Sequence, residues 1–148
     1  MTTAKQETGD VQTLADFVLF SQRSCILRLS ANLNRDKISY PQFFLLAYLA
    51  EEDCLSMSSI AKMMGHSTAA ATGMVDKLQE LGYISRATAA SDRRKIMVRI
   101  SKAGTALVER MRLNIARDLA SIMREDGRTS EETAAVASAV RRTRRAMA

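Results

Sequence analysis

Residues 58–104 read SSIAKMMGHSTAAATGMVDKLQELGYISRATAASDRRKIMVRISKAG, and the order of patterns in this stretch decides the fold. Two helical patterns lie on either side of a short turn. The first is predicted over Ser58–Met64, with Ser58 as N-cap, and ends at Gly65 because glycine adopts the left-handed conformation without steric penalty. The second is predicted over Thr68–Leu81. The apolar stripes are Ile60, Met63 and Met64 in the first helix and Ala71, Met74, Val75, Leu78 and Leu81 in the second. Two adjacent apolar faces predict two crossed helices.

After Gly82 the helical pattern gives way to alternation. Ile84 starts a short alternating stretch, and apolar side chains alternate again from Ile96 to Ile100, so the simplest interpretation is a hairpin of two strands. Its loop is predicted over Thr88–Arg94, a polar stretch rich in small residues. Ser101 is predicted to cap the next helix. Two crossed helices followed by a hairpin are typical of a winged helix-turn-helix.

The wing and the end of the second helix resemble a known family. Asp92-Arg93-Arg94, the alternating strand and Ser101-Lys102-Ala103-Gly104 look like the wing and following helix start of the MarR family of bacterial transcription regulators. Upstream, Val75-Asp76-Lys77-Leu78 and Leu81-Gly82-Tyr83-Ile84 are similar to the end of that family's recognition helix. The resemblance implies a mainly α fold with a small β-hairpin wing, flanked by N- and C-terminal dimerisation helices.

Length and composition fit one intracellular domain. The chain has 148 residues, which is long enough for one ordinary domain but leaves little room for two independent ones. Its hydrophobic fraction of 47% is enough for a packed core. The longest apolar run, Phe43–Ala50, is too short to span a bilayer, and no apolar leader follows the start, so we expect a cytoplasmic protein without a membrane partner. Cys25 and Cys54 have no CxxC spacing and are expected to be reduced thiols.

Net positive charge is greatest in the middle of the chain. The formal net charge is +6, distributed as −2 over residues 1–54, +5 over residues 55–104 and +3 over residues 105–148. A basic segment over the predicted winged helix-turn-helix favours a polyanionic partner, with a solvated basic surface as the alternative.

The flanking segments are predicted to dimerise. We expect a single domain over 1–148, with dimerisation helices at 11–34 and 105–148 and a DNA-binding part at 38–104. The stripe of a helix over Val11–Leu33 consists of Leu14, Phe17, Val18, Phe20, Cys25, Leu29 and Leu33. The stripe of the C-terminal part consists of Leu107, Met111, Ile115, Leu119 and Ile122, followed by a break at Asp126-Gly127-Arg128 and a last helix with Ala137, Val140 and Met147. These surplus apolar faces suggest burial against a second copy, with a monomeric helical bundle as the alternative.

Between the flanks, Tyr40-Pro41 is predicted to start a buried helix through Phe43, Phe44, Leu46 and Leu49.

A dimer of this kind is expected to place two recognition helices in successive major grooves and each wing on a flanking minor groove of a pseudo-palindromic operator. The candidate DNA-binding residues are Ser67, Thr68, Ala69, Ala70, Thr72, Gly73, Lys77, Asp92, Arg93 and Arg94. Arg94 is the first candidate for the minor groove. In the family, the residue at the position of Asp92 tends to pair with a wing arginine.

The predicted recognition helix departs from the family. Relatives often carry polar side chains and an arginine where this chain has Ala69, Ala70, Thr72 and Gly73, so bidentate base reading is expected to be poor. Alanine methyls that touch thymine methyls, hydroxyl contacts and shape reading by the wing are the remaining routes to specificity. Gly73 inside a helix costs roughly 1 kcal/mol relative to alanine, which close approach to DNA or simple tolerance at a surface would explain.

Other chemistry is weakly indicated. His66 is the single histidine, so we expect no metal site, and with no cofactor motif or activated nucleophile we expect no catalytic residues and no enzyme. Three functions remain open: a homodimeric repressor released by a small-molecule effector, a regulator gated by cysteine oxidation, and a winged-helix interaction module without DNA binding. No motif assigns residues to an effector pocket.

Overall fold

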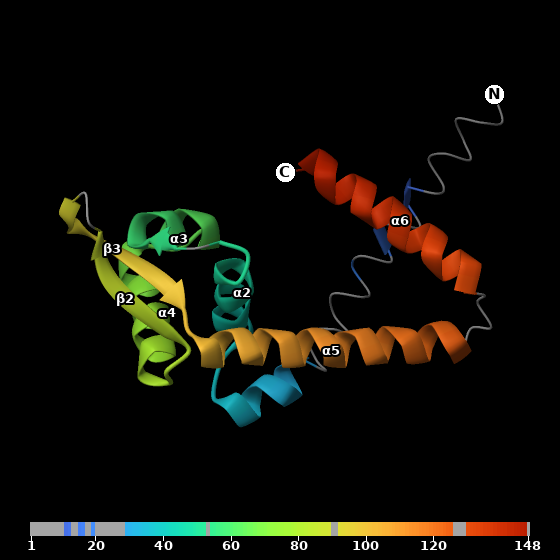
Figure 1. The fold of residues 1–148 in the computed structure, drawn as a ribbon, viewed down its shortest axis with the longest axis horizontal. Helices are drawn as coiled ribbons and strands as arrows, with labels where there is room; N and C mark the ends of the chain where they lie inside the picture. Colours follow the sequence, from blue (N-terminus) through green and yellow to red (C-terminus); the bar gives the residue numbers. More distant parts are fainter. Residues whose placement is uncertain are drawn as a thin grey trace. The chain divides into compact units, whose positions relative to one another are not determined.

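The computed structural model describes residues 11–12, 15–16, 19, 29–52, 54–89, 92–125 and 130–147 (Figure 1). The chain forms two compact units, residues 1–111 and residues 112–148. The first unit contains η1 (Asn34–Asp36), α2 (Tyr40–Leu49), β1 (Leu55–Ser56), α3 (Met57–Met64), α4 (Thr68–Glu80), β2 (Ile84–Ala89), β3 (Asp92–Ile100) and the first turns of α5 (Lys102–Glu125). The second contains the rest of α5 and α6 (Ser130–Met147). The mainly helical class with a small sheet is confirmed.

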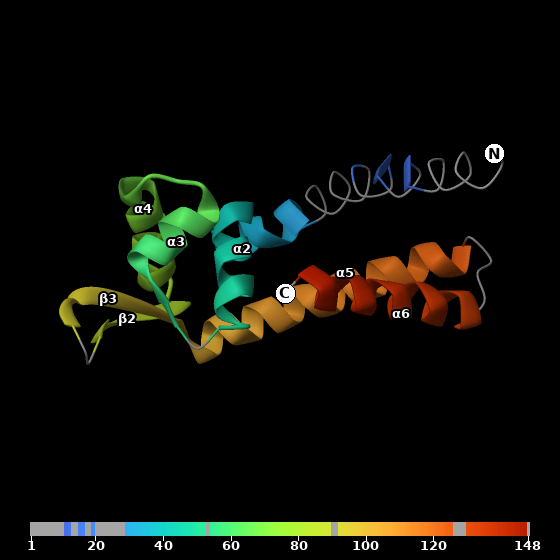
Figure 2. The same cartoon turned by 90° about the horizontal axis from the view of Figure 1, so that it is seen from above.

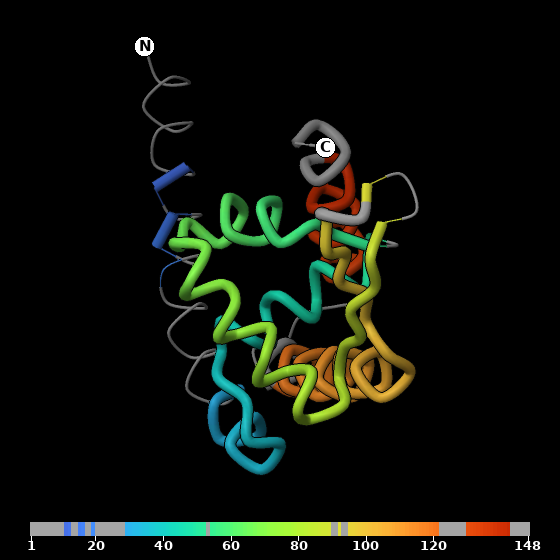
Figure 3. Tube along the Cα trace, turned by 90° about the vertical axis from the view of Figure 1, so that its left-hand side faces the viewer, coloured from blue at the N-terminus to red at the C-terminus, as the bar shows by residue number. Residues whose placement is uncertain are grey.

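The helix-turn-helix consists of α3 and α4, which lie across one another on either side of a tight turn (Figure 3). Gly65 ends α3 with φ of 62°, as expected, and Ser67 caps α4, its hydroxyl accepting a hydrogen bond from the Ala70 amide at 3.2 Å. The predicted N-cap of the first helix was wrong by two residues. Ser56, not Ser58, is the N-cap, because its side chain accepts the Ser59 amide at 3.1 Å.

The sheet has three antiparallel strands in the order β1-β3-β2, and its β2–β3 hairpin extends away from α2 (Figure 2). β1 was missed from sequence, because a strand of two residues has no visible period. It forms only through pairing with β3, with Leu55 opposite Val98 and Ser56 opposite Met97. The predicted loop Thr88–Arg94 was too long, since β2 runs to Ala89 and β3 begins at Asp92.

The core of the first unit lies where α2, α3, α4, the sheet and the start of α5 meet. Its fully buried side chains include Leu33, Leu45, Leu46, Leu49, Ile60, Val75, Leu78, Val98, Leu107 and Met111. The predicted stripe of α4 is confirmed at Ala71, Val75 and Leu78, whereas Met74 and Leu81 are only half-buried. Tertiary contact covers just one side of this helix.

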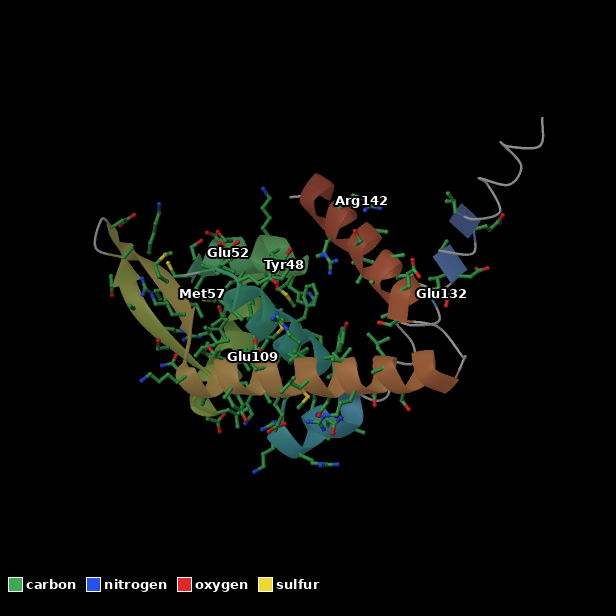
Figure 4. All side chains as sticks on the ribbon, turned by 45° about the vertical axis from the view of Figure 1, so that its right-hand side comes forward. Tyr48, Glu52, Met57, Glu109, Glu132 and Arg142 are labelled. Atoms are coloured by element: carbon green, nitrogen blue, oxygen red, sulfur yellow. The ribbon has the colours of Figure 1, made fainter. Side chains whose placement is uncertain are left out.

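The start of α2 is fixed by a capping box, in which the Ser39 amide donates to Gln42 Oε1 at 2.8 Å and the Gln42 amide donates to Ser39 Oγ at 3.4 Å. The predicted burial of Phe44 was wrong. Its ring is 43% exposed and stacks at a tilt on Tyr48, which is also 43% exposed and is labelled in Figure 4, with ring centroids 5.5 Å apart. Leu45 takes the buried position instead.

A close junction joins the start of α5 to the turn that follows α4. Ser101 Oγ donates to the Gly82 carbonyl at 2.7 Å, and the Ser101 amide donates to the Tyr83 carbonyl at 2.9 Å. Ser101 Oγ also accepts the Gly104 amide at 3.1 Å, which confirms the predicted cap. Gly104 is buried here, and a larger residue does not fit, because a Cβ would overlap the Tyr83 carbonyl oxygen and lie 2.7 Å from Ile100 Cγ1.

The predicted flanking helices are only partly described. The described residues of the segment 11–33 are helical, with Leu29 and Leu33 buried and Val11 and Leu19 exposed. The remaining members of that stripe, the break at 126–128 and Met147 lie outside the description of side chains. In the second unit Leu113, Leu119, Val136 and Val140 are each about half exposed or more. None of the described helices is both long enough and apolar enough for a membrane span.

Candidate nucleic-acid interface

The exposed side of the first two turns of α4 carries small side chains. Thr68, Ala69, Ala70 and Gly73 are exposed, while Ala71 and Val75 face the core. No described side chain on these two turns is charged or carries an amide. This surface therefore has no group that can form the bidentate hydrogen bonds by which arginine recognises guanine or asparagine recognises adenine.

Thr72 is more restricted than its sequence position indicated. Its hydroxyl donates to the Thr68 carbonyl at 2.8 Å, so its proton is used inside the helix. The oxygen remains an acceptor and the methyl group remains available for apolar contact. Ser67 differs, because its oxygen accepts the Ala70 amide while its own proton is not needed for the cap.

Gly73 has no packing reason within the described chain. A Cβ built on this residue meets nothing within 4 Å, and its backbone has an ordinary helical φ. The fold would therefore accept a side chain at this position, but the helix surface here carries none.

The two charged residues of the third turn are both paired. Lys77 Nζ lies 2.9 Å from Glu80 Oε2, and the two side chains are 41% and 69% exposed. Such a surface pair contributes at most about 1 kcal/mol, so phosphate can replace Glu80 at low cost. Asp76 Oδ1 accepts a hydrogen bond at 2.5 Å from Arg86 Nη2, which joins α4 to β2.

The wing holds its basic residues in an irregular part of the hairpin. Thr88 pairs with Ile96, but the next residue of β2, Ala89, pairs with Asp92, so Arg93, Arg94 and Lys95 are extra residues on β3. A bulge of this kind takes residues out of the regular ladder. Lys95 is exposed and Asp92 is half-buried, while the side chains of Arg93 and Arg94 lie outside the description.

Two further cations were missed from sequence. A groove of about 820 Å³ runs between the start of α3 and the outer face of the sheet, and Lys95 and Arg99 line it together with Ser58 and Ser59. Lys95 and Arg99 are four residues apart on β3, and an even spacing places side chains on the same face of a strand. This spacing of the basic residues could have revealed them from the sequence. The groove extends the basic surface from the wing toward α3.

The residues considered for other chemistry do not converge. Cys54 is a free, half-buried thiol at the groove, His66 is exposed in the turn, and Cys25 lies outside the described residues. Among the described residues no three potential metal ligands come together.

Comparison with known proteins agrees with this geometry. The model of the MarR family matches residues 38–96, which run from the start of α2 to the middle of β3. An uncharacterized HTH-type transcriptional regulator, YfiV of Bacillus subtilis, is 31% identical over 93 residues, 60% of this chain and 58% of that protein. The organic hydroperoxide resistance transcriptional regulator of the same organism is 24% identical over 95 residues, 64% of this chain and 65% of that one. The chain thus spans less than two thirds of both relatives.

Solved structures extend the likeness to almost the whole chain. The YusO protein from Bacillus subtilis is 25% identical with a TM-score of 0.68, covering 97% of this chain and 99% of that one. A MarR family protein from Bacillus stearothermophilus shares the fold with a TM-score of 0.77 at 20% identity, over 97% of this chain and 96% of that one. Residues 38–96, which contain the helix-turn-helix and most of the wing, are thus similar to the MarR family, and the fold of the chain is similar to that of solved MarR family structures.

Proposed function

We propose that this protein is a transcription regulator that binds a pseudo-palindromic double-stranded DNA operator as a homodimer. The observation that carries the proposal is the position of exposed α4 beside a hairpin whose basic residues leave the regular ladder. A helix fits the major groove, and a basic wing beside it fits the phosphates and the narrow minor groove.

In this proposal α4 enters the major groove and Arg94, with Arg93 and Lys95, contacts the flanking backbone and minor groove. The uncharged surface of α4 supports a division of labour: the wing supplies most of the affinity, and the methyl groups of Ala69, Ala70 and Thr72 favour thymine. Ser67 and Lys77 add phosphate contacts.

The dimer is proposed from the second unit. Leu113, Leu119, Val136 and Val140 expose apolar surface that a second copy would cover. Two-fold symmetry then sets two recognition helices about one turn of DNA apart, near 10 base pairs. Repression, with release by a small-molecule effector, completes the proposal and rests on the family resemblance.

Two other functions predict different behaviour. A cysteine-gated regulator releases DNA under mild peroxide and loses that response when Cys25 and Cys54 are replaced by alanine. An interaction module, which the small residues on α4 favour, shows no DNA binding that weakens with salt.

The central test is the salt dependence of binding, measured by fluorescence anisotropy on a duplex of about 30 base pairs, long enough for two half-sites. The duplex is one recovered from a random library with the wild-type protein. We expect Arg94→Ala to weaken binding by about 1–3 kcal/mol and to lower the salt slope by about one unit. Arg141→Ala, in exposed α6 and outside the proposed interface, is the matched control. Unchanged affinity in a folded Arg94→Ala variant would remove the wing from the interface.

A further inference from the structure

One ion pair connects the proposed recognition helix to the wing. Arg86 on β2 donates from Nη2 to Asp76 Oδ1 on α4 at 2.5 Å, ten residues away along the chain. Arg86 lies opposite Val98 in the sheet, and Val98 is fully buried. Because directly opposite residues share a face of the sheet, Arg86 lies on the same face as buried Val98.

Asp76 lies close to the surface proposed to enter the groove. It follows Gly73 by three residues and Thr72 by four, so the three share one side of α4. Its side chain is 56% exposed. An unpaired carboxylate at this position would repel a nearby phosphate backbone.

Arg86 is an unusual choice for stability alone. Its side chain is only 24% exposed, and its buried Nε has no hydrogen-bond partner among the described residues. A buried donor without an acceptor costs free energy, and residues that break such a rule tend to serve function. Its guanidinium pairs with the Asp76 carboxylate and so forms a polar link between α4 and β2.

We propose that Arg86 is a positioning residue for DNA binding, which sets the recognition helix against the wing through Asp76 and cancels the charge of that carboxylate. The proposal rests on the proposed function. It makes a prediction of unusual sign: removing a negative charge from the DNA-binding side weakens DNA binding.

The experiment compares two substitutions that remove equal charge from α4. Asp76→Asn breaks the bridge to Arg86, whereas Glu80→Gln, one turn further on, frees Lys77. On the library-derived duplex, Asp76→Asn is expected to bind about tenfold more weakly, the scale of coupling between residues in contact. Glu80→Gln is expected to bind as tightly as the wild type or more tightly. Equal or tighter binding by Asp76→Asn would overturn the proposal.

A double-mutant cycle separates positioning from general stability. Lys95→Ala on the wing is measured alone and together with Asp76→Asn. If the bridge aligns helix and wing, Lys95→Ala costs less in the Asp76→Asn background than in the wild type. An equal cost in both backgrounds, or no cost in the wild type, contradicts the proposal.

Arg86→Lys provides an independent variant, because it keeps the charge but loses the planar guanidinium. We expect it to bind more weakly than the wild type and more tightly than Arg86→Met, with thermal unfolding confirming that each is folded. Equal binding by both Arg86 variants and the wild type overturns the proposal. Wild-type protein that binds no duplex would instead refute the proposed function.

Discussion

Gly73 shows how one residue separates stability from function. A glycine inside a helix costs free energy, and here no neighbour within 4 Å of a Cβ explains it. Ala69 and Ala70, on the same uncovered side of α4, are small as well. The low surface is therefore a property of the side that the proposed function turns toward DNA.

We predict that Gly73→Ala raises the free energy of unfolding by about 0.5–1 kcal/mol, because alanine has the higher helix propensity and meets no clash. The same methyl group is expected to weaken DNA binding by holding the helix away from the groove. Urea unfolding and anisotropy on one preparation measure the two effects. A variant that is more stable and binds equally well would show that close approach at this residue is unimportant.

At the scale of elements, the junction of α4, β2 and α5 fixes the position of the turn from which the first strand of the wing, β2, starts. Ser101 bonds to Gly82 and Tyr83 across the sequence, and Gly104 lies against the Tyr83 carbonyl. Burial raises the pKa of the Tyr83 phenol, with Asp36 adding to the rise and Arg110 opposing it. Asp36 and Arg110 themselves pair at 2.7 Å, so η1 and α5 meet beside this turn.

Gly104→Ala is predicted to act in the opposite direction to Gly73→Ala, although the chemical change is the same. The added Cβ overlaps backbone that cannot rotate away, and overpacking of this kind costs about 1–3 kcal/mol. Thermal unfolding of the two glycine variants side by side provides the matched comparison. A Gly104→Ala variant as stable as the wild type would mean that α5 shifts freely at this junction.

At the scale of the whole molecule, the proposed dimer depends on side chains that the single chain leaves exposed. Leu119 is 48% exposed on α5. Leu119→Glu therefore removes little packing from the monomer, but it would bury a charge without a partner in a dimer. We predict that this variant sediments as a monomer at micromolar concentration while the wild type sediments as a dimer. Ala106→Glu, exposed near the start of the same helix, is the control. A monomeric wild type would contradict the dimer.

Local sequence determined the elements whose signals are short in range. Helical spacing, Gly65 and Gly82 as stops, and alternation before Ile100 were enough to predict the helix-turn-helix and a hairpin, because hydrophobic periodicity and left-handed glycines act within a few residues. The same patterns carried the family resemblance that the matched model confirmed. The candidate site residues on α4 followed from their place in this order.

Tertiary structure decided what depends on contacts between distant residues. β1 exists only because β3 pairs with it, and the length of the wing follows from a register that skips three residues between Ile96 and Asp92. Phe44 is exposed because the core lies on the other side of α2. The close approach of Gly104 to the Tyr83 carbonyl and the Asp76–Arg86 bridge each join residues that are ten or more positions apart in the sequence. Periodicity gives which side of an element is apolar, but packing alone determines which groups from other elements meet it.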